Sequence, residues 1–206
     1  MPIFNNALAG ASGGAGGGGG GYQIERSLRF DKGSSAYLNR SFGTATSTTT
    51  FTISMWVKRV SFDQVNYLFA AGTGTQGYLI FDADILRFYG VNGDLKTTAK
   101  YRDPSAWYHI VAVADTSNGT ADDRMRLYVN GVRLTDANGD FSTHTQPNSG
   151  QSLGDFNSAN THYVNRLSSG SYEDFYMADF NFIDGSALQA SDFGEPDDNG
   201  VWQPKA

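Results

Sequence analysis

Alternating apolar and polar residues recur along most of the chain and predict β-strands rather than helices. The clearest example is the stretch 107–134. Residues 107–114 are aromatic or β-branched and apolar on both sides, which is typical of a strand inside a sandwich. Residues 125–129 then alternate with period two, as a half-buried strand does. Asn130 and Gly131 follow, a pair that favours a tight type I′ turn, so we expect the chain to fold straight back.

The same alternation continues on both sides of this stretch. Residues 51–59 place four apolar side chains on one side, and the residues between them, including Trp56, face the other. The apolar four are Phe51, Ile53, Met55 and Val57. Further short strands are expected at 67–72, 77–81, 85–89, 95–100, 151–154 and 163–164, and Ile24, Leu28 and Phe30 are candidate core residues. Strands at this spacing, with Gly or Asn-Gly between them, predict an all-β fold of antiparallel sheets. The polar stretch 135–171 is expected to form mostly long loops, where binding residues often lie.

The first 21 residues differ from the rest. Residues 1–9 are small and mildly apolar, and nine of the twelve residues from 10 to 21 are glycine. Such a run has almost no preferred conformation, so a flexible linker is the simplest interpretation. The alternative is a docking peptide on a tether. In that interpretation the partner-binding residues are Pro2, Ile3, Phe4 and Leu8. We expect a folded domain over 22–206.

Composition removes several classes of function. The net charge is −6, and no cluster of Lys and Arg offers a nucleic acid a site. No apolar stretch is long enough to span a membrane, no polybasic anchor is present, and the N-terminus lacks the pattern of a signal peptide. We therefore expect neither nucleic acid nor membrane as a partner, and synthesis in the cytoplasm. The chain has no cysteine, hence neither disulfides nor thiolate chemistry.

The sequence does not favour an enzyme. A glycosidase needs two carboxylates flanking the scissile bond, and the nearest pattern, Asp179 with Asp184, lacks a Glu in either place. His109 lies in a predicted central strand and is expected to be packed or hydrogen-bonded. His144 and His162 lie in predicted loops, without a nucleophile elbow or zinc-ligand spacing around them. We expect no catalytic residues and no metal ligands.

Calcium and sugar remain as possible ligands. Acidic residues at 82–84, 122–123 and 197–199 offer oxygen atoms to calcium, although turn and solubility roles are the simpler interpretation. No cofactor is expected, with calcium left open.

A sugar-binding site would consist of aromatic ring faces next to amide and carboxylate groups. Trp56 and Trp107 are expected to be core residues within strands. The candidate carbohydrate-binding residues are therefore Trp202, near the C-terminus, with Tyr163 and Tyr172 in the loop region.

Several of these stretches resemble concanavalin-A-like, laminin-G-like jelly-roll domains. The resemblance rests on residues 27–38, 51–59, 107–111 with 127–131, and 175–188. It implies a two-sheet antiparallel jelly-roll sandwich, here preceded by an extended Gly-rich N-terminal arm. The same fold serves lectins, glycosidases and virion proteins, so it does not fix the function.

The two ends of the chain resemble virion structural proteins of tailed phages, marine phages and cyanophages especially. The motifs are Ser27-Leu28-Arg29-Phe30 near the start, and Asp192-Phe193-Gly194-Glu195 with Gly200-Val201-Trp202-Gln203-Pro204-Lys205 at the end. The resemblance implies a location in the virion and a capsid decoration or fibre subunit exposed on the head. It also implies docking on other virion proteins and a homo-oligomer, with a trimer favoured. The alternative is a tail-fibre or receptor-binding module that recognises polysaccharide on the host surface.

Overall fold

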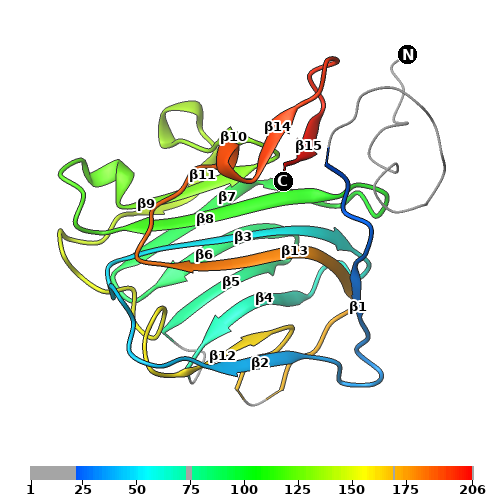
Figure 1. Ribbon diagram of the computed structural model, residues 1–206, viewed down its shortest axis with the longest axis horizontal. Coiled ribbons are helices and arrows are strands. Elements are labelled where there is room, and N and C mark those ends of the chain that lie inside the picture. The colour runs from blue at the N-terminus through cyan, green and yellow to red at the C-terminus, as the bar shows by residue number, and fades with distance from the viewer. Residues whose placement is uncertain (1–21, 73–75, 169, 206) are drawn as a thin grey trace.

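The computed structural model describes residues 22–72, 76–168 and 170–205. Within these ranges the chain is a sandwich of two antiparallel sheets (Figure 1). The predicted docking residues Pro2, Ile3, Phe4 and Leu8 lie outside the described residues. No helix in the described part is long and apolar enough to cross a membrane. The predicted fold class, an all-β jelly roll, is confirmed.

The first sheet has six strands. Their order is β1 (Leu28–Phe30), β13 (Phe175–Asp184), β3 (Thr50–Arg59), β8 (Tyr108–Asp115), β9 (Met125–Val129) and β10 (Val132–Arg133). The predicted turn after β9 is present, because Asn130 and Gly131 both have positive φ angles, 49° and 81°. The first and last strands of this sheet in chain order, β1 and β13, are therefore neighbours.

The second sheet has seven strands, and a small hairpin follows at the C-terminus. The order in the second sheet is β11 (Phe141–Thr145), β7 (Gly93–Lys100), β6 (Ile85–Gly90), β5 (Gly77–Asp82), β4 (Val65–Ala71), β12 (Thr161–Val164) and β2 (Leu38–Ser41). The hairpin pairs β14 (Gly194–Pro196) with β15 (Trp202–Pro204). Three short 3-10 helices complete the description: η1 (Ala121–Asp123), η2 (Asp136–Asn138) and η3 (Ala190–Asp192).

The core confirms the period-two alternation of β3. Phe51, Ile53, Met55 and Val57 are fully buried between the sheets. The opposite side of the first sheet is covered as well, because η3 and the C-terminal hairpin pack on β8 and β9 in a second apolar cluster. Trp56 faces outward on β3 and is still only 7% exposed.

Four expectations about local structure were wrong. Residues 141–145 form β11, although Ser, Thr and His give no apolar alternation there, and residues 151–154 form no strand. His144 and His162 lie in strands β11 and β12 rather than in loops. Leu28 is 53% exposed because it lies on edge strand β1 at the rim of the sandwich.

Candidate functional site

A groove of about 390 Å³ lies on the outer face of the first sheet. One wall is the segment 22–27 that leads into β1, and the other is formed by residues 200–204 around β15. Figure 1 shows these two segments at the same end of the molecule. All three tryptophans of the chain, Trp56, Trp107 and Trp202, line the groove, and we call it the three-tryptophan groove. The other lining residues are Tyr22, Gln23, Ile24, Glu25, Arg26, Ser27, Ala106, Asn130, Ala178, Gly200, Val201, Gln203 and Pro204.

The floor of the groove follows from the pairing of β3 with β13. Trp56 and Ala178 are opposite each other in this pairing, and both face outward. On its other side Trp56 stacks against His109 of β8, with ring centroids 4.8 Å apart. Because Ala178 is small, it leaves room beside Trp56 that a larger side chain would fill. The indole N–H of Trp56 has no hydrogen-bond partner in the described part of the chain.

His109 joins the sheet to the C-terminal hairpin. Its Nδ1 accepts a hydrogen bond from Nε1 of Trp202 at 3.0 Å, which leaves the ring proton on Nε2. That nitrogen lies 3.0 Å from Oγ of Ser54 and donates to it. His109 is fully buried, and burial lowers the pKa of its ring to about 4. The imidazole is therefore neutral at physiological pH, and it fixes the position of Trp202.

Two glycines make room for Trp202. A Cβ atom on Gly131 would lie 2.4 Å from the indole ring, and one on Gly194 would lie 2.6 Å from it. Both distances are shorter than van der Waals contact, so any other residue at either position would displace Trp202. The hairpin and the Asn130-Gly131 turn are thus fitted to each other.

Polar side chains at the groove are available to a ligand. No hydrogen bond or ion pair joins residues 22–27 to the rest of the described chain, and Gln23, Glu25 and Arg26 are exposed. Oδ1 of Asn130 accepts a hydrogen bond from the backbone N–H of His109 at 2.8 Å, whereas its amide N–H groups have no partner among the described residues. The groove therefore combines aromatic surface with unpaired amide, carboxylate and guanidinium groups.

The structure corrects the predicted role of one tryptophan and separates the candidate sugar residues. Trp107 precedes β8 instead of lying in it, and it is half-buried at the groove rather than in the core. Trp202 lies in the groove, but Tyr163 and Tyr172 do not line it. The other groove residues, Ala178 and Asn130 among them, were missed because no local pattern marks them.

Tyr163 and Tyr172 belong to a separate cluster around Arg166. The guanidinium carbon of Arg166 lies 4.4 Å from the ring centroid of Tyr37, 5.5 Å from that of Tyr163 and 5.9 Å from that of Tyr172. These are cation–π distances, so the chain's own arginine already covers these rings. The cluster is a weaker candidate for a sugar platform than the groove.

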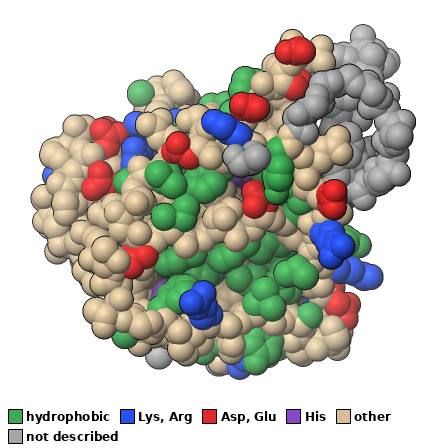
Figure 2. Space-filling model, viewed as in Figure 1, with side chains coloured by type: hydrophobic (Ala, Val, Ile, Leu, Met, Phe, Trp, Pro, Cys, Tyr) green, Lys and Arg blue, Asp and Glu red, His purple; other side chains and the backbone are tan. Residues whose placement is uncertain are grey.

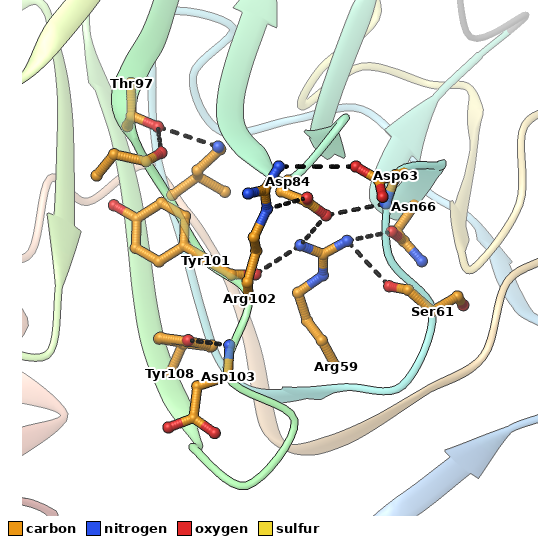
Figure 3. Close-up of polar contacts among 12 residues, drawn as sticks. Arg59, Ser61, Asp63, Asn66, Asp84, Thr97, Tyr101, Arg102, Asp103 and Tyr108 are labelled. Atoms are coloured by element: carbon orange, nitrogen blue, oxygen red, sulfur yellow. Dashed lines mark hydrogen bonds and ion pairs between the residues drawn. The ribbon is translucent and has the colours of Figure 1, made fainter.

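A cluster of charged groups between the sheets is structural (Figure 3). The guanidinium of Arg59 pairs with Oδ1 of Asp84 at 2.9 Å, and their side chains are 1% and 0% exposed. Arg59 also donates to Oδ1 of Asn66 and to the backbone carbonyls of Ser61 and Tyr101. Arg102 pairs with the other oxygen of Asp84 at 2.7 Å. Both side chains of the Arg59–Asp84 pair are thus withdrawn from solvent.

The environment of Asp84 keeps it ionised. Burial alone would raise the pKa of Asp84, but hydrogen bonds from the Asp63 backbone N–H, Arg102 and Arg59 lower it to about 2. Asp84 is one of the residues considered for calcium, and its oxygens are already taken. The described residues contain no group of three or more His, Cys, Asp or Glu that could hold a metal ion. Calcium binding thus gains no support here.

The two carboxylates considered for catalysis have structural surroundings. Asp184 accepts hydrogen bonds from the backbone N–H groups of Thr46 and Ser47 and from the amide of Asn157. Asp179 lies at an irregularity of β13, with a positive φ of 48°. Asp184 therefore holds a loop in place, and Asp179 belongs to the backbone irregularity of its strand.

The matches to known proteins establish the family. The family model Laminin_G_3, described as the Concanavalin A-like lectin/glucanases superfamily, matches residues 31–191. The chain belongs to this superfamily, as the resemblance predicted. A superfamily of lectins and glucanases is consistent with a glycan-binding module. A search of curated protein sequences finds no match.

Solved structures share the fold at low sequence identity. A heptameric SAP-like pentraxin from Limulus polyphemus has a TM-score of 0.50 and 16% identity, over 74% of this chain and 71% of the pentraxin. The binding domain of Paraclostridial Mosquitocidal Protein 1 has a TM-score of 0.54 and 16% identity, over 81% of this chain and 41% of that domain. The chain thus spans less than half of the mosquitocidal protein's binding domain. At these identities the likeness shows the fold alone.

Proposed function

We propose that the chain is a glycan-binding module whose ligand lies in the three-tryptophan groove. The observation that carries the proposal is the convergence of all three tryptophans on one hollow, beside unpaired polar groups. Indole faces suit the C–H faces of sugar rings, and amide and carboxylate groups bind hydroxyls. The superfamily is named for lectins, and the mosquitocidal relative in fold is a binding domain.

The chain offers a direct test of this proposal. Because no tryptophan lies outside the groove, intrinsic fluorescence reports only on this site. A glycan array identifies bound sugars, and fluorescence titration of the strongest gives its Kd. The variant Ala178→Met fills the space beside Trp56, and we expect it to weaken binding at least about tenfold.

The matched control is Ala121→Met, which changes an exposed residue of η1 away from the groove. This variant should bind as the wild type does. If Ala178→Met binds sugar with unchanged Kd while its fluorescence stays native-like, the groove is not the binding site.

We further propose that the module is a phage virion structural protein, a capsid decoration or fibre subunit held through residues 1–21. The support is the resemblance of both chain ends to virion proteins and the apolar peptide that precedes the glycine run. A trimer is the proposed oligomer, on the same resemblance. The alternative is a receptor-binding module of a tail fibre, which would use the same groove on host polysaccharide.

Location and anchoring are tested on particles from the source phage. In electron microscopy, a gold-labelled antibody to residues 22–206 should bind the head if the chain is a decoration protein. It should bind the tail if the chain is a receptor-binding module. Removing residues 1–21 should abolish incorporation while the folded domain stays soluble. Incorporation of the truncated protein at the wild-type level would refute the docking role.

A further inference from the structure

Charge is nearly absent from the three-tryptophan groove. Among the described residues that line it, only Glu25 and Arg26 are charged, and they are adjacent and of opposite sign. A protein recognises an acidic sugar with an Arg or Lys that has no protein carboxylate next to it. Two N–H groups of the guanidinium then donate to the two oxygens of the ligand's carboxylate. Here Glu25 directly precedes Arg26 in the groove wall, so the one guanidinium of the lining is accompanied by a carboxylate that repels such a ligand. The net charge of −6 for the chain adds to that repulsion.

The uncharged polar groups of the groove are suited to hydroxyls. Gln23, Asn130 and Gln203 bring three carboxamide side chains to the lining. A carboxamide has both donor and acceptor atoms, so it matches a hydroxyl, which also donates and accepts. The unpaired N–H groups of Asn130 need an acceptor, and a sugar oxygen supplies one without adding charge.

The size of the groove limits the length of its ligand. Its volume of about 390 Å³ lies at the lower end of the roughly 300–1,000 Å³ that small-molecule sites span. A pyranose ring with its substituents fills a large part of that volume. The site therefore fits a short epitope or a chain end, whereas a long polysaccharide would extend beyond it.

We propose that the three-tryptophan groove takes an uncharged sugar epitope of one or two pyranose rings and discriminates against acidic sugars. This inference rests on the proposed glycan-binding function and specifies its ligand class. The partly exposed indoles of Trp107 and Trp202 contact the C–H face of the sugar, and the buried Trp56 forms the floor beneath it. The amides of Gln23, Asn130 and Gln203 bind its hydroxyls.

The test is tryptophan fluorescence titration of the full chain with two sets of sugars. The neutral set is the methyl glycosides and disaccharides of glucose, galactose and mannose, and the acidic set is N-acetylneuraminic acid and glucuronic acid. Each titration is run at low and at high ionic strength. We expect at least one neutral sugar to bind, with a Kd that does not depend on salt, because no charge pair is screened. Glu25→Gln should reduce the preference for neutral over acidic sugars, because it removes the carboxylate that repels an acidic ligand.

The outcomes separate this inference from the proposed function. Preferential binding of an acidic sugar that weakens with salt and with Arg26→Gln overturns the ligand class but keeps a glycan-binding groove. Binding of a neutral sugar that is unaffected by Ala178→Met overturns the groove as the site. Absence of binding by both sets, and by a glycan array, overturns the inference together with the function on which it rests.

Discussion

His109 shows how one buried side chain can control the acid stability of this fold. Its ring holds Trp202 on one nitrogen and Ser54 on the other, and it is neutral in the folded state. In the unfolded chain the pKa returns to about 6.5, whereas in the folded protein it is about 4. Between these values the unfolded state binds more protons, so the free energy of unfolding falls as the pH falls. Above pH 6.5 the full stability is present.

We expect the free energy of unfolding to decrease by about 2 kcal/mol between pH 7 and pH 5 through His109. Urea denaturation at the two pH values measures the change. His162, whose pKa burial also lowers, contributes in the same direction. The variant His109→Gln keeps an acceptor for Trp202 and a donor for Ser54 but cannot be protonated. It should reduce the pH dependence, and an unchanged slope would show that other groups cause it.

The buried pair of Arg59 and Asp84 should behave unlike the pairs at the surface. Asp84→Asn leaves the guanidinium of Arg59 buried without its counter-charge, which costs about 3–5 kcal/mol of unfolding free energy. Asp123→Asn is the matched control, because Arg133 and Asp123 form a more exposed pair, 37% and 30%, and it should cost less than about 1 kcal/mol. Chemical denaturation at pH 7 compares the two. Equal losses would contradict the structural role of Asp84.

Acid should break the Arg59–Asp84 pair at a lower pH than the pH at which it destabilises the fold through His109. The pKa of Asp84 is about 2 in the folded protein and 3.8 in the unfolded chain. Its contribution to stability is therefore complete above pH 3.8 and is lost as the pH falls toward 2. Asp84→Asn should remove this second, more acidic decrease.

At the scale of elements, Trp202 and Phe193 hold the C-terminal hairpin on the sheet. Gly194→Ala places a methyl group 2.6 Å from the indole within the same hairpin, so Trp202 must shift from its position against His109. We expect a red shift of tryptophan emission as Trp202 becomes more exposed, and a weaker Kd for the groove ligand. Gly119→Ala is the control, because a Cβ there meets nothing within 4 Å. An unshifted spectrum for Gly194→Ala would mean that the hairpin adjusts without moving Trp202.

Sequence patterns predict the elements of this fold better than they predict its groove. Period-two alternation located β3 and β9, which each have one side against the core, and a run apolar on both sides located β8, which is buried on both faces. Strand β11 was missed because its Ser, Thr and His residues give no such alternation. The groove joins residues from β3, β13, the chain before β1, the residues before β8, the turn after β9 and the hairpin, and no spacing in the sequence records that these six segments meet.

The tryptophans illustrate the same limit. Trp56 and Trp107 occur in apolar surroundings in the sequence, which predicted core positions for both. Trp56 is indeed buried in its strand, although it faces the outer side of the sheet, whereas Trp107 is half-buried just before its strand. Trp202 was predicted as a contact residue, and only its partners in space, His109 and Gly131, explain why it is fixed there.

At the scale of the whole molecule, the described sandwich contains its own core. The buried clusters run from Phe30 to Phe193 and include both sheets. We therefore expect residues 22–206 to unfold cooperatively, with a free energy of unfolding within about 0.5 kcal/mol of the full chain. Thermal denaturation of both proteins tests this. A clearly lower Tm for residues 22–206 would show that residues 1–21 belong to the fold.

The position of the groove beside segment 22–27 has a consequence for a domain displayed on a particle. In a domain held through residues 1–21, this groove lies on the side near the particle surface rather than on the side that points away from it. The twelve residues from 10 to 21 would then set the clearance, about 20 Å for a glycine-rich chain. Slender chain ends could enter that gap, whereas bulky glycoconjugates would be kept out. Tether length would act as a size filter, and lengthening the glycine run would widen the range of ligands captured.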